Sequence, residues 1–426
     1  MRVLVKLLLF IGMFSLVGGR EATAQISLQS LINAAPEGGT VRLKAGTYHE
    51  AILINKSVVL VGGNGTVIKT CSTKPAVTIT GNNVTLKDLK IENCQKDKGK
   101  SMILISGKHH RLENLSIQTS HKGIQLEKVE QSHFFRINLS GNGKNTGFDL
   151  WESHHNRFEG IMINQVEDGF YMENSHDNTF IGNTIQNSRY GMHVMFSDNI
   201  TLIQNLSKNN FSGAMIMGTH HSIMKENKLI ENNQNVNAQG LLLYDVHQST
   251  IEDNEISHNR VGLFMENSSG NTLKNNKFIA NFVGTQMNKI KSNVMEYNLF
   301  VSNVNDIQAT KAPDNTIQRN YWDAAWKLDT DGDGMSNIRY SADPYFLNLA
   351  RETPPYQLFF QHPGLVVLQK MLKSPDRMLV KDQAPLMNME GKQSATTEPH
   401  SVLLWIISLF MISSSLFIIY LGRKKA

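Results

Sequence analysis

The sequence is poor in several residues and patterns that mark common classes of protein. It holds only two cysteines among 426 residues, Cys71 and Cys94, so at most one disulfide can form within the chain. The net charge of +5 is spread along the chain, and neither a basic block nor a nucleic-acid-binding motif is present. We therefore predict no nucleic-acid partner. The sequence also lacks the Leu-x-x-Leu-x-Leu frame of leucine-rich repeats.

Glycine recurs at a nearly constant interval of 22 residues through the middle of the chain, at Gly123, Gly147, Gly169, Gly191, Gly213, Gly240, Gly262 and Gly284. Asparagine keeps the same interval, with the same five-residue excess before Asn254, at Asn183, Asn205, Asn227, Asn254, Asn276, Asn298 and Asn320. This period is too short for a pair of helices, so each unit is predicted to be one coil of a solenoid built from short strands. Residues one period apart then become neighbours on adjacent strands, about 4.8 Å apart.

Apolar and polar residues alternate after each glycine. The first and third positions are apolar in nearly every coil, as in Phe148 and Leu150 or Met192 and Val194, and are expected to point into the core. We predict an all-β fold, a right-handed parallel β-helix with about 22 residues per coil over residues 25–322. The glycines are interpreted as sites of positive φ or tight corners, and the asparagines as scaffold whose amides bond the next coil.

Both ends of the chain carry segments that are predicted to lie outside this fold. Residues 1–24 combine a basic start, an apolar core and a run of small residues, which is typical of a secretory signal peptide. Residues 402–421 form an uncharged, mostly apolar run followed by a basic tail, residues 422–426, which predicts a transmembrane helix with the tail inside the cell. A discarded anchor signal and a buried core helix are the alternatives for this run. Residues 374–401 are mixed polar and are predicted to be a tether to the membrane.

The repeat brings the two cysteines together. Cys71 and Cys94 lie 23 residues apart in similar sequence contexts, so we expect them to stack in neighbouring coils. In an oxidising compartment such a pair can form a disulfide. A reduced pair or a soft metal site is the alternative.

The second and fourth positions after each glycine are expected to face outward. Polar side chains fill them in several coils, whereas the central coils place His193 and Met195, then Met215 and Met217, on one outer face. Thioether and imidazole ligands suit Cu(I) better than harder cations, so these four residues are the predicted copper site. The alternative is an apolar docking patch for a partner. The residues predicted to flank the four on this surface are Trp151, Tyr171, Leu242, Tyr244 and Phe264.

A second column of polar side chains lies in the turn seven residues after each glycine. It contains His154, His176, Asp198, His220 and His247, with His221 one position further on. Histidine is the commonest metal ligand, so these residues are secondary candidates for metal binding. The simpler interpretation, which we favour, is that histidine replaces asparagine in a polar turn ladder and stacks without metal.

A turn rich in Asp and Gly follows the repeats. Asp329, Asp331 and Asp333 have the one-three-five spacing of a calcium loop, although Tyr340 takes the twelfth position in place of a glutamate. Calcium binding and a plain Asp/Gly turn are both open interpretations. Residues 323–373 are predicted to form a small C-terminal cap, in which residues 364–372 make a short helix over the last coil.

The central coils resemble the NosD family, and the resemblance is carried by residues 189–198, 213–217 and 240–246. The Asp/Gly turn and residues 354–372 are similar to the C-terminal part of that family. The resemblance covers residues 28–373 and is most specific in its centre, because the early motif at residues 38–48 is shared with many pectin-lyase-like β-helices.

The resemblance implies a non-catalytic accessory protein that helps to insert copper into nitrous oxide reductase during denitrification. Members of the family act outside the cytoplasm with an ABC-type ATPase and its membrane permease, and a copper chaperone is a further expected partner. Copper would be held transiently, as Cu(I). Familiar members are soluble in the periplasm, whereas the apolar run at residues 402–421 predicts that this chain is anchored to the cell membrane.

Two other functions fit a β-helix. A polysaccharide lyase or epimerase needs clustered carboxylates and a nearby basic residue acting on an acidic sugar. The outward acids are dispersed here, and Arg189 and Arg260 precede their glycines by two residues instead of lying beside those acids. A surface carbohydrate-binding solenoid would use the aromatic residues of the outer face, but it has no need of a Met/His centre.

Overall fold

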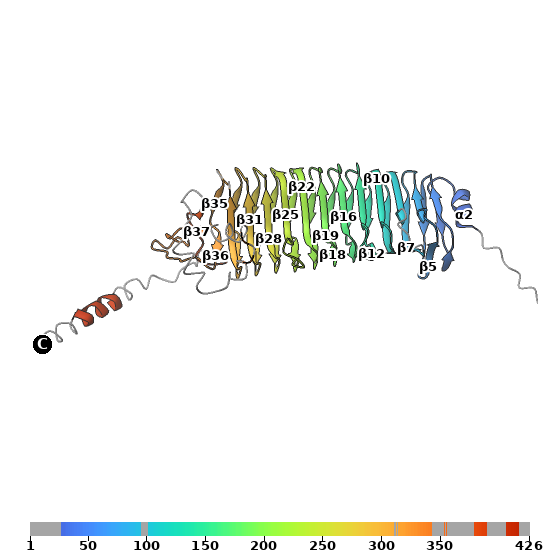
Figure 1. The fold of residues 1–426 in the computed structure, drawn as a ribbon. Coiled ribbons are helices and arrows are strands. Elements are labelled where there is room, and N and C mark those ends of the chain that lie inside the picture. Colours follow the sequence, from blue (N-terminus) through green and yellow to red (C-terminus); the bar gives the residue numbers. More distant parts are fainter. Residues whose placement is uncertain are drawn as a thin grey trace, which may run out of the picture.

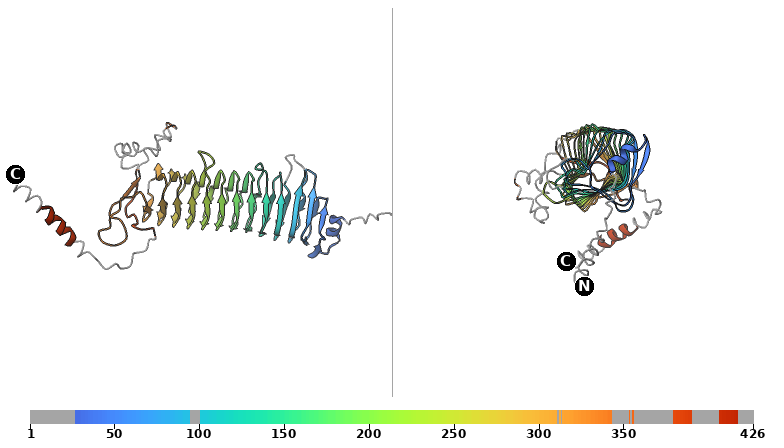
Figure 2. Two further views of the ribbon diagram at one scale, coloured as in Figure 1. Left: turned by 90° about the horizontal axis from the view of Figure 1, so that it is seen from below. Right: turned by 90° about the vertical axis from the view of Figure 1, so that its right-hand side faces the viewer.

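The chain forms a long stack of coils that superpose when seen along the axis of the stack (Figures 1 and 2). The computed structural model describes residues 27–94, 101–310, 312, 314–342, 353, 355, 379–389 and 406–416. Within this part, the strands of the two large sheets are all parallel, and the solenoid is right-handed. The all-β parallel β-helix predicted from the sequence is therefore confirmed.

One large sheet contains 12 strands that follow one another along the stack. Its strands are β3 (Ile52–Ile54), β6 (Val77–Ile79), β8 (Ile103–Lys108), β10 (Ile124–Glu130), β13 (Phe148–Trp151), β16 (Asp168–Glu173), β19 (Tyr190–Met195), β22 (Ser212–His220), β25 (Gln239–His247), β28 (Val261–Glu266), β31 (Val283–Asn288) and β34 (Asn305–Thr310). Because each coil adds one strand, residues one period apart stand opposite each other, for example Tyr171 opposite His193. This sheet carries the predicted copper ligands.

The other large sheet contains 24 strands, in two rows along the stack. The first row contains the first strand that each coil contributes to this sheet. Its strands are β1 (Gly39–Arg42), β4 (Val58–Val61), β7 (Thr85–Asn93), β9 (Arg111–Gln118), β11 (His133–Phe135), β14 (Arg157–Glu159), β17 (Thr179–Ile181), β20 (Thr201–Ile203), β23 (Ile223–Lys225), β26 (Thr250–Glu252), β29 (Thr272–Lys274), β32 (Val294–Glu296) and β35 (Thr316–Gln318). The remaining strands are β2 (Gly46–Tyr48), β5 (Thr66–Thr70), β12 (Asn138–Ser140), β15 (Met162–Asn164), β18 (Thr184–Gln186), β21 (Leu206–Lys208), β24 (Lys228–Ile230), β27 (Glu255–Ser257), β30 (Lys277–Ile279), β33 (Leu299–Val301) and β36 (Tyr321–Trp322). The helix α2 (Leu28–Ala34) lies at the N-terminal end of the stack (Figure 1).

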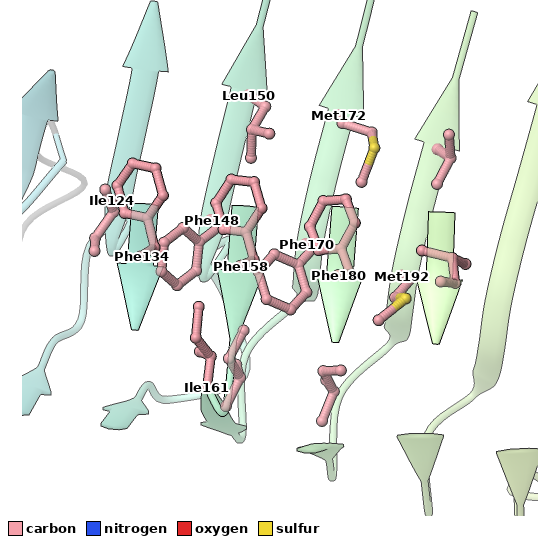
Figure 3. Packing of buried hydrophobic residues seen from close by; sticks show 14 of the residues in the cluster. Ile124, Phe134, Phe148, Leu150, Phe158, Ile161, Phe170, Met172, Phe180 and Met192 are labelled. Atoms are coloured by element: carbon pink, nitrogen blue, oxygen red, sulfur yellow. The ribbon is translucent and has the colours of Figure 1, made fainter. Parts of the chain in front are cut away.

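Stacked aromatic rings fill the central coils (Figure 3). Phe134, Phe158 and Phe180 come from β11, β14 and β17, with ring centroids 4.8 and 4.6 Å apart. Phe148 and Phe170 come from the 12-stranded sheet and stack at 5.1 Å. All five are fully buried. Such pairs contribute roughly 0.5–1.5 kcal/mol each beyond the burial of their area, so they hold the coils in register beneath the outer face.

The ladder glycines are required by the close approach of neighbouring coils. A Cβ atom on Gly169 would lie 2.5 Å from the carbonyl oxygen of Gly191, and one on Gly191 would lie 2.3 Å from that of Gly213. The eight ladder glycines have no positive φ, so the prediction of positive φ at these positions was wrong. Positive φ occurs instead five residues after these glycines, for example at Asn174 and Phe196.

The asparagine ladder bonds each coil to the next, as the sequence predicted. The Asn205 side-chain oxygen accepts hydrogen bonds from both the backbone N–H and the side-chain amide of Asn183, at 3.0 and 2.9 Å. The last member, Asn320, makes the same two bonds to Asp382, at 2.9 and 3.1 Å. The buried indole of Trp322 also donates to Asp382, at 3.0 Å. A carboxylate from far along the chain therefore ends the ladder.

This ending corrects the predicted domain boundaries. Asp382 belongs to β38 (Val380–Asp382), which pairs with β37 (Tyr340–Ala342) in an antiparallel two-stranded sheet. Part of the segment predicted to be a tether, residues 374–401, therefore packs on the last coil and belongs to the cap. The helix predicted for residues 364–372 lies outside the described residues.

The two cysteines lie in neighbouring coils and form a disulfide. The Cα atoms of Cys71 and Cys94 are 4.8 Å apart, the spacing of adjacent strands. Each cysteine directly follows a strand, β5 and β7 respectively, and these two strands pair in parallel. The bond therefore links two successive coils near the N-terminal end of the stack.

The predicted signal peptide, residues 1–24, and the predicted tail, residues 422–426, lie outside the described residues. Of the predicted membrane span, residues 402–421, the structure describes residues 406–416, which are helical. Among the residues that are described, no helix combines the length and the apolar character needed to cross a membrane. The span stays a prediction from the sequence.

Candidate functional site

The structure places the four predicted copper ligands side by side on the outer face of the 12-stranded sheet. His193 on β19 stands opposite Met215 on β22, and Met195 stands opposite Met217 in the same pair of strands. All four side chains are partly buried, and the imidazole of His193 is 12% exposed. We call these four residues the Met/His face. At the strand spacing of about 4.8 Å, each of these side chains has another potential soft donor as its neighbour on the adjacent strand.

The donors of the Met/His face are chemically uniform. Three thioethers and one imidazole are soft or borderline ligands without formal charge, a set that fits a soft monovalent cation such as Cu(I). A hard divalent cation would find no carboxylate within the set. The residues present therefore fit the copper that the sequence predicted.

A buried carboxylate supports the imidazole of His193. Asp168 begins β16, and its side chain is 4% exposed. It lies 2.9 Å from the Nδ1 atom of His193 and accepts hydrogen bonds from the Nε and Nη2 atoms of Arg189, at 3.0 and 2.9 Å. Arg189 also forms an ion pair with Glu167 at 3.2 Å. The sequence predicted that Arg189 lies apart from the outward acids. It instead pairs with Asp168, which was not among the acids considered there.

Two tyrosines hold the same imidazole from its sides. The rings of Tyr171 and Tyr190 meet the His193 ring edge to face, with centroids 5.1 and 5.0 Å away. The Tyr171 hydroxyl donates to Glu173 at 2.6 Å and lies 3.8 Å from the sulfur of Met195. Burial and the bond to Glu173 raise the pKa of Tyr171 well above its usual value, so its hydroxyl stays protonated.

Toward the N-terminal end, the outer face changes from soft donors to charged groups. Asp149 stands opposite Tyr171 and is buried beneath Lys122 and Trp151. The Trp151 indole donates to Asp149 at 2.8 Å. An open cavity of about 390 Å³ lies next to this group, lined by Lys122, Gln125, Glu127, Lys128, Trp151 and Glu152. Asp149, the second buried acid on this side of the Met/His face, is therefore also paired.

The residues predicted to form a partner surface surround the Met/His face. Leu242 and Phe264 extend the row of His193 and Met215, and Tyr244 extends the row of Met195 and Met217. Tyr244 is 41% exposed, whereas Leu242 and Phe264 are partly buried. On the other side, Trp151 is 39% exposed and its ring lies 5.8 Å from that of Tyr171. These side chains form an apolar rim on both sides of the four donors.

The turn column behaves as a hydrogen-bonded ladder in its first coils. The Nδ1 atom of His154 accepts the backbone N–H of His176 at 3.0 Å, and Nδ1 of His176 accepts that of Asp198 at 2.9 Å. The two rings stack at 5.3 Å, 6° from parallel. With Nδ1 accepting, the neutral ring carries its proton on Nε2, so neither nitrogen is free for a metal. Burial and His176 lower the pKa of His154, which favours this neutral form.

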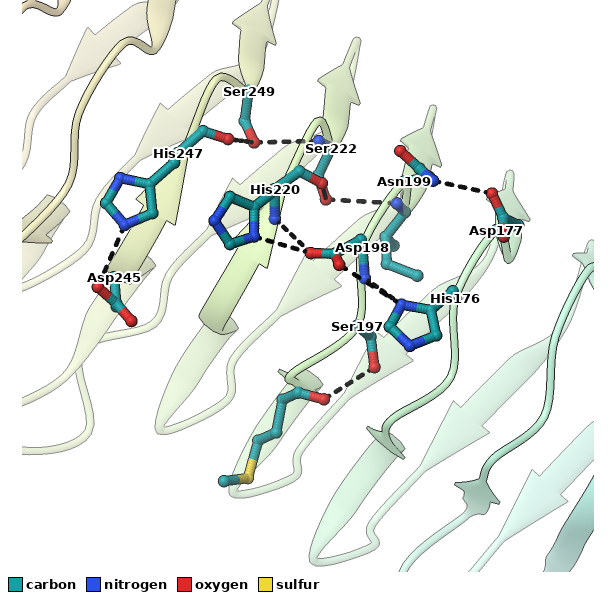
Figure 4. A network of polar contacts seen from close by, with 12 residues as sticks. His176, Asp177, Ser197, Asp198, Asn199, His220, Ser222, Asp245, His247 and Ser249 are labelled. Atoms are coloured by element: carbon teal, nitrogen blue, oxygen red, sulfur yellow. Dashed lines mark hydrogen bonds and ion pairs between the residues drawn. The ribbon is translucent and has the colours of Figure 1, made fainter.

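The column continues through polar contacts of other kinds (Figure 4). Asp198 accepts the backbone N–H of His220 at 2.7 Å and lies 3.0 Å from its Nδ1 atom. His247 lies between Ser269 at 2.8 Å and Asp245 at 3.2 Å. His221, one position further on, is exposed and contacts the ring of His220. These contacts favour the interpretation of a turn ladder over that of a metal path.

The Asp/Gly turn gathers its three carboxylates at the surface. The ligand atoms of Asp329, Asp331 and Asp333 lie within 4.8 Å of one another, and in the described part of the chain no other His, Cys, Asp or Glu residues form such a group. The carboxylate of Asp329 accepts the backbone N–H groups of Gly332 and Gly334, at 2.6 and 3.0 Å. The turn is therefore closed by its own hydrogen bonds, and calcium binding stays a prediction.

Two residues of this region were missed from the sequence although each carried a signal. Asp168 is the only acid that directly precedes a ladder glycine. Phe196 is the only apolar side chain at the fifth position after a ladder glycine, where the other coils have Asn, Asp, Glu, Lys or Gly. It is 53% exposed, next to Met195. Both exceptions can be seen when the coils are aligned on their glycines. They were overlooked because neither position holds core residues or potential metal ligands in the other coils.

Comparison with solved structures shows the same fold in sugar-modifying proteins. The A-module of the mannuronan C-5 epimerase AlgE4 of Azotobacter vinelandii matches with a TM-score of 0.53 and 16% identity, over 68% of this chain and 94% of that one. The periplasmic alginate epimerase AlgG matches with a TM-score of 0.54 and 13% identity, over 69% and 82%. At these identities the likeness extends to the fold alone. No curated protein sequence matches the chain.

The comparison with family models is more specific. The model described as periplasmic copper-binding protein (NosD) matches residues 129–331, which include every strand from β11 to β36. The matched range contains the whole Met/His face together with Asp168 and Arg189. Over these central coils, the chain matches the NosD family.

Proposed function

We propose that this chain is a non-catalytic accessory protein that binds Cu(I) on its Met/His face and delivers it to nitrous oxide reductase outside the cytoplasm. The observation that carries the proposal is the register of β19 and β22, which aligns His193 with Met215 and Met195 with Met217. A neutral set of soft donors on a rigid sheet holds Cu(I) without enclosing it. Because the face is only partly buried, the metal can leave toward a partner.

The surroundings of the Met/His face support transfer between proteins. The exposed aromatic rings of Trp151, Phe196 and Tyr244 lie around the four donors, and aromatic and Met-rich surfaces are enriched at protein interfaces. As partners we propose an ABC-type ATPase with its permease, nitrous oxide reductase, and a copper chaperone. The extracytoplasmic location agrees with the periplasmic family, and the anchor at residues 402–421 is proposed from the sequence alone. Co-purification of the full chain from membranes with the ATPase and the permease tests this assembly.

A lyase or epimerase is less well supported by the geometry. Proton abstraction from a sugar needs a base that is free to accept a proton at neutral pH. The raised pKa of Tyr171 keeps its hydroxyl protonated, so the imidazole of His193, bound to Asp168 through Nδ1, is the candidate base beside it. Arg189 is held by two carboxylates and is not free to neutralise a uronate. The structural likeness to epimerases therefore extends to the fold, without a matching set of free catalytic groups.

A carbohydrate-binding solenoid would use the cavity beside Trp151. An indole face and polar groups are suitable for a sugar ring. However, Lys122 is paired with Asp149, and Lys128 with Glu152, so both lysines around this cavity are already bound to carboxylates. This function also leaves the Met/His face unexplained, and we rank it below copper delivery.

An anaerobic competition titration with a Cu(I) chelator tests the proposal on the detergent-solubilised full chain. The test variant replaces all three sulfurs, Met195→Leu, Met215→Leu and Met217→Leu, because leucine keeps the volume and removes the donor. We expect its Cu(I) affinity to fall by more than about 100-fold, beyond what the loss of an outer-shell contact alone would cost.

The matched control is Met162→Leu, which removes a methionine that is 54% exposed on β15, in the other sheet. This control should bind Cu(I) as the wild type does. Equal affinities in the triple variant and the wild type would remove the site assignment. Turnover of a uronic-acid polymer by the wild type would overturn the accessory function itself.

A further inference from the structure

The ion pair behind the Met/His face fixes the state of its imidazole. Asp168 is almost fully buried and lies 2.9 Å from Nδ1 of His193. Arg189 donates hydrogen bonds from two nitrogen atoms to the same carboxylate. An ionised carboxylate can only accept, so the Nδ1 atom of His193 must carry a hydrogen. The neutral ring then has its free electron pair on Nε2.

The neighbouring rings and the exposure of His193 complete this arrangement. Tyr171 and Tyr190 clamp the ring edge to face, so it cannot turn freely about its side-chain bonds. Among the described residues, no hydrogen-bond partner occupies Nε2, in contrast to the blocked rings of His154 and His176 in the turn column. A histidine whose Nδ1–H is held by a carboxylate is the usual form of a metal-binding imidazole.

Arg189 has a second consequence, which concerns charge. Without it, Asp168 would place an unpaired carboxylate directly beside the Met/His face. Carboxylate ligands favour harder and divalent cations, whereas thioethers favour Cu(I). The guanidinium occupies both carboxylate oxygens, at 2.9 and 3.1 Å, and removes Asp168 from the set of available ligands. The four donors of the Met/His face are then neutral, and the carboxylate opposite Met195, Glu173, is bound by the Tyr171 hydroxyl at 2.6 Å.

We infer that the Asp168–Arg189 pair is a positioning and selectivity device, in which Asp168 presents Nε2 of His193 to the metal and Arg189 keeps the site selective for a soft monovalent cation over a divalent one. The inference rests on the proposed copper site, and it adds two residues that do not touch the metal. Substitutions of Asp168 and Arg189 therefore test the positioning of the imidazole and the choice of cation separately, whereas a substitution of His193 would change both.

The first test reads the tautomer of His193 in the metal-free full chain by nitrogen-15 NMR with labelled histidine, using His193→Gln to assign the signal. The wild type should show the hydrogen on Nδ1 and a bare Nε2. Asp168→Asn should mix the two tautomers, because an amide can donate as well as accept. A wild-type ring with its hydrogen on Nε2 would overturn the inference. Because this result is read from the wild-type protein, misfolding of a variant cannot affect it.

The second test measures Cu(I) and Zn(II) affinities of the same proteins by chelator competition. Asp168→Asn should weaken Cu(I) binding by about 10- to 100-fold, the usual cost of losing an outer-shell partner of a histidine ligand. Arg189→Gln should strengthen Zn(II) binding at least about tenfold, since Asp168 becomes available, and should therefore lower the preference for Cu(I) over Zn(II).

Arg260→Gln is the matched control, because Arg260 also precedes its ladder glycine by two residues but lies over the ring of Phe282, 3.6 Å from its centroid. It should change neither affinity. Unchanged Zn(II) affinity in Arg189→Gln would overturn the selectivity role. A wild type that binds no Cu(I) would refute the proposed function, whereas the tautomer of the metal-free protein would still decide the positioning role of Asp168.

Discussion

Phe196 holds its backbone in the left-handed region, with φ of 47°, a conformation that bulky residues adopt rarely. The corresponding positions of neighbouring coils are Asn174, Gly218 and Asp245, residue types that tolerate this conformation. The Phe196 ring is 53% exposed and lies over Gly218, where an added Cβ would approach it to 2.8 Å. An exposed aromatic ring in a strained position beside the Met/His face suits contact with the proposed partner better than it suits stability.

We therefore expect Phe196→Asn to stabilise the protein by about 1 kcal/mol, because asparagine relieves the strain of the left-handed backbone. The free energy of unfolding in urea is the measurement. Trp326→Asn serves as the control, since Trp326 is 79% exposed and has no positive φ, and its removal should bring no gain. A loss of stability in Phe196→Asn would show instead that the ring is a packing element.

For single residues, the sequence predicted which face of the solenoid a side chain lies on better than it predicted which side chains contact each other. The period was enough to place His193, Met195, Met215 and Met217 on one face, because register follows from counting. It could not reveal that Asp168 reaches His193, since the two lie 25 residues apart and outside a common column. Side-chain reach across columns depends on rotamers and burial, which a repeat pattern does not encode.

The strand stack sets a steric limit on each coil. At Gly191, an added Cβ would lie 2.1 Å from the Ser207 hydroxyl oxygen and 2.3 Å from the Gly213 carbonyl oxygen. The Ser207 hydroxyl donates to that carbonyl at 2.6 Å, so neither neighbour can move without breaking this bond. The glycine ladder is thus a packing requirement of strands that carry the Met/His face.

Gly191→Ala should accordingly destabilise the protein by about 3 kcal/mol, the upper end of the range for overpacked cores. It should also weaken Cu(I) binding, because β19 would shift against β22. Gly63→Ala is the control, because a Cβ atom on Gly63 would meet nothing within 4 Å, and its effect should stay within about 1 kcal/mol. Thermal unfolding of both variants decides the matter, and equal transition temperatures would contradict the steric argument.

The C-terminal end of the solenoid is covered by residues that lie outside the sequence repeat. Asp382 lies 62 residues after Asn320, yet it accepts the hydrogen bonds that a further coil would have accepted. The period stops before this segment, so the sequence offered only composition, which indicated a tether. Closure of a solenoid end is a general need, because the last strands otherwise expose unpaired groups. The existence of a cap was therefore predictable, but not the segment that supplies it.

The same end holds a group that makes stability depend on pH. Asp306 on β34 is buried, with Asn303 and the Tyr340 hydroxyl as its partners, at 3.1 and 3.4 Å. Burial outweighs these bonds and raises the pKa of Asp306 from 3.8 to about 6. The folded protein therefore binds this proton more tightly than the unfolded chain. Its contribution favours the folded state at low pH and is lost as the pH rises from about 4 to about 6.

Asp306→Asn should remove this dependence and stabilise the protein at pH 8 by up to about 3 kcal/mol, the free energy that corresponds to a shift of this size. Near pH 4 the variant and the wild type should be nearly equal, because the protonated acid and the amide are then both neutral. Urea unfolding at a series of pH values measures the difference between the two proteins, in which the shared carboxylates cancel. Asp314→Asn, an exposed aspartate of the same region, should follow the wild type at every pH. A constant difference between Asp306→Asn and the wild type from pH 4 to 8 would contradict this effect of the buried charge. The stability of the cap would then depend on packing, such as the Trp322–Tyr340 stack at 4.3 Å.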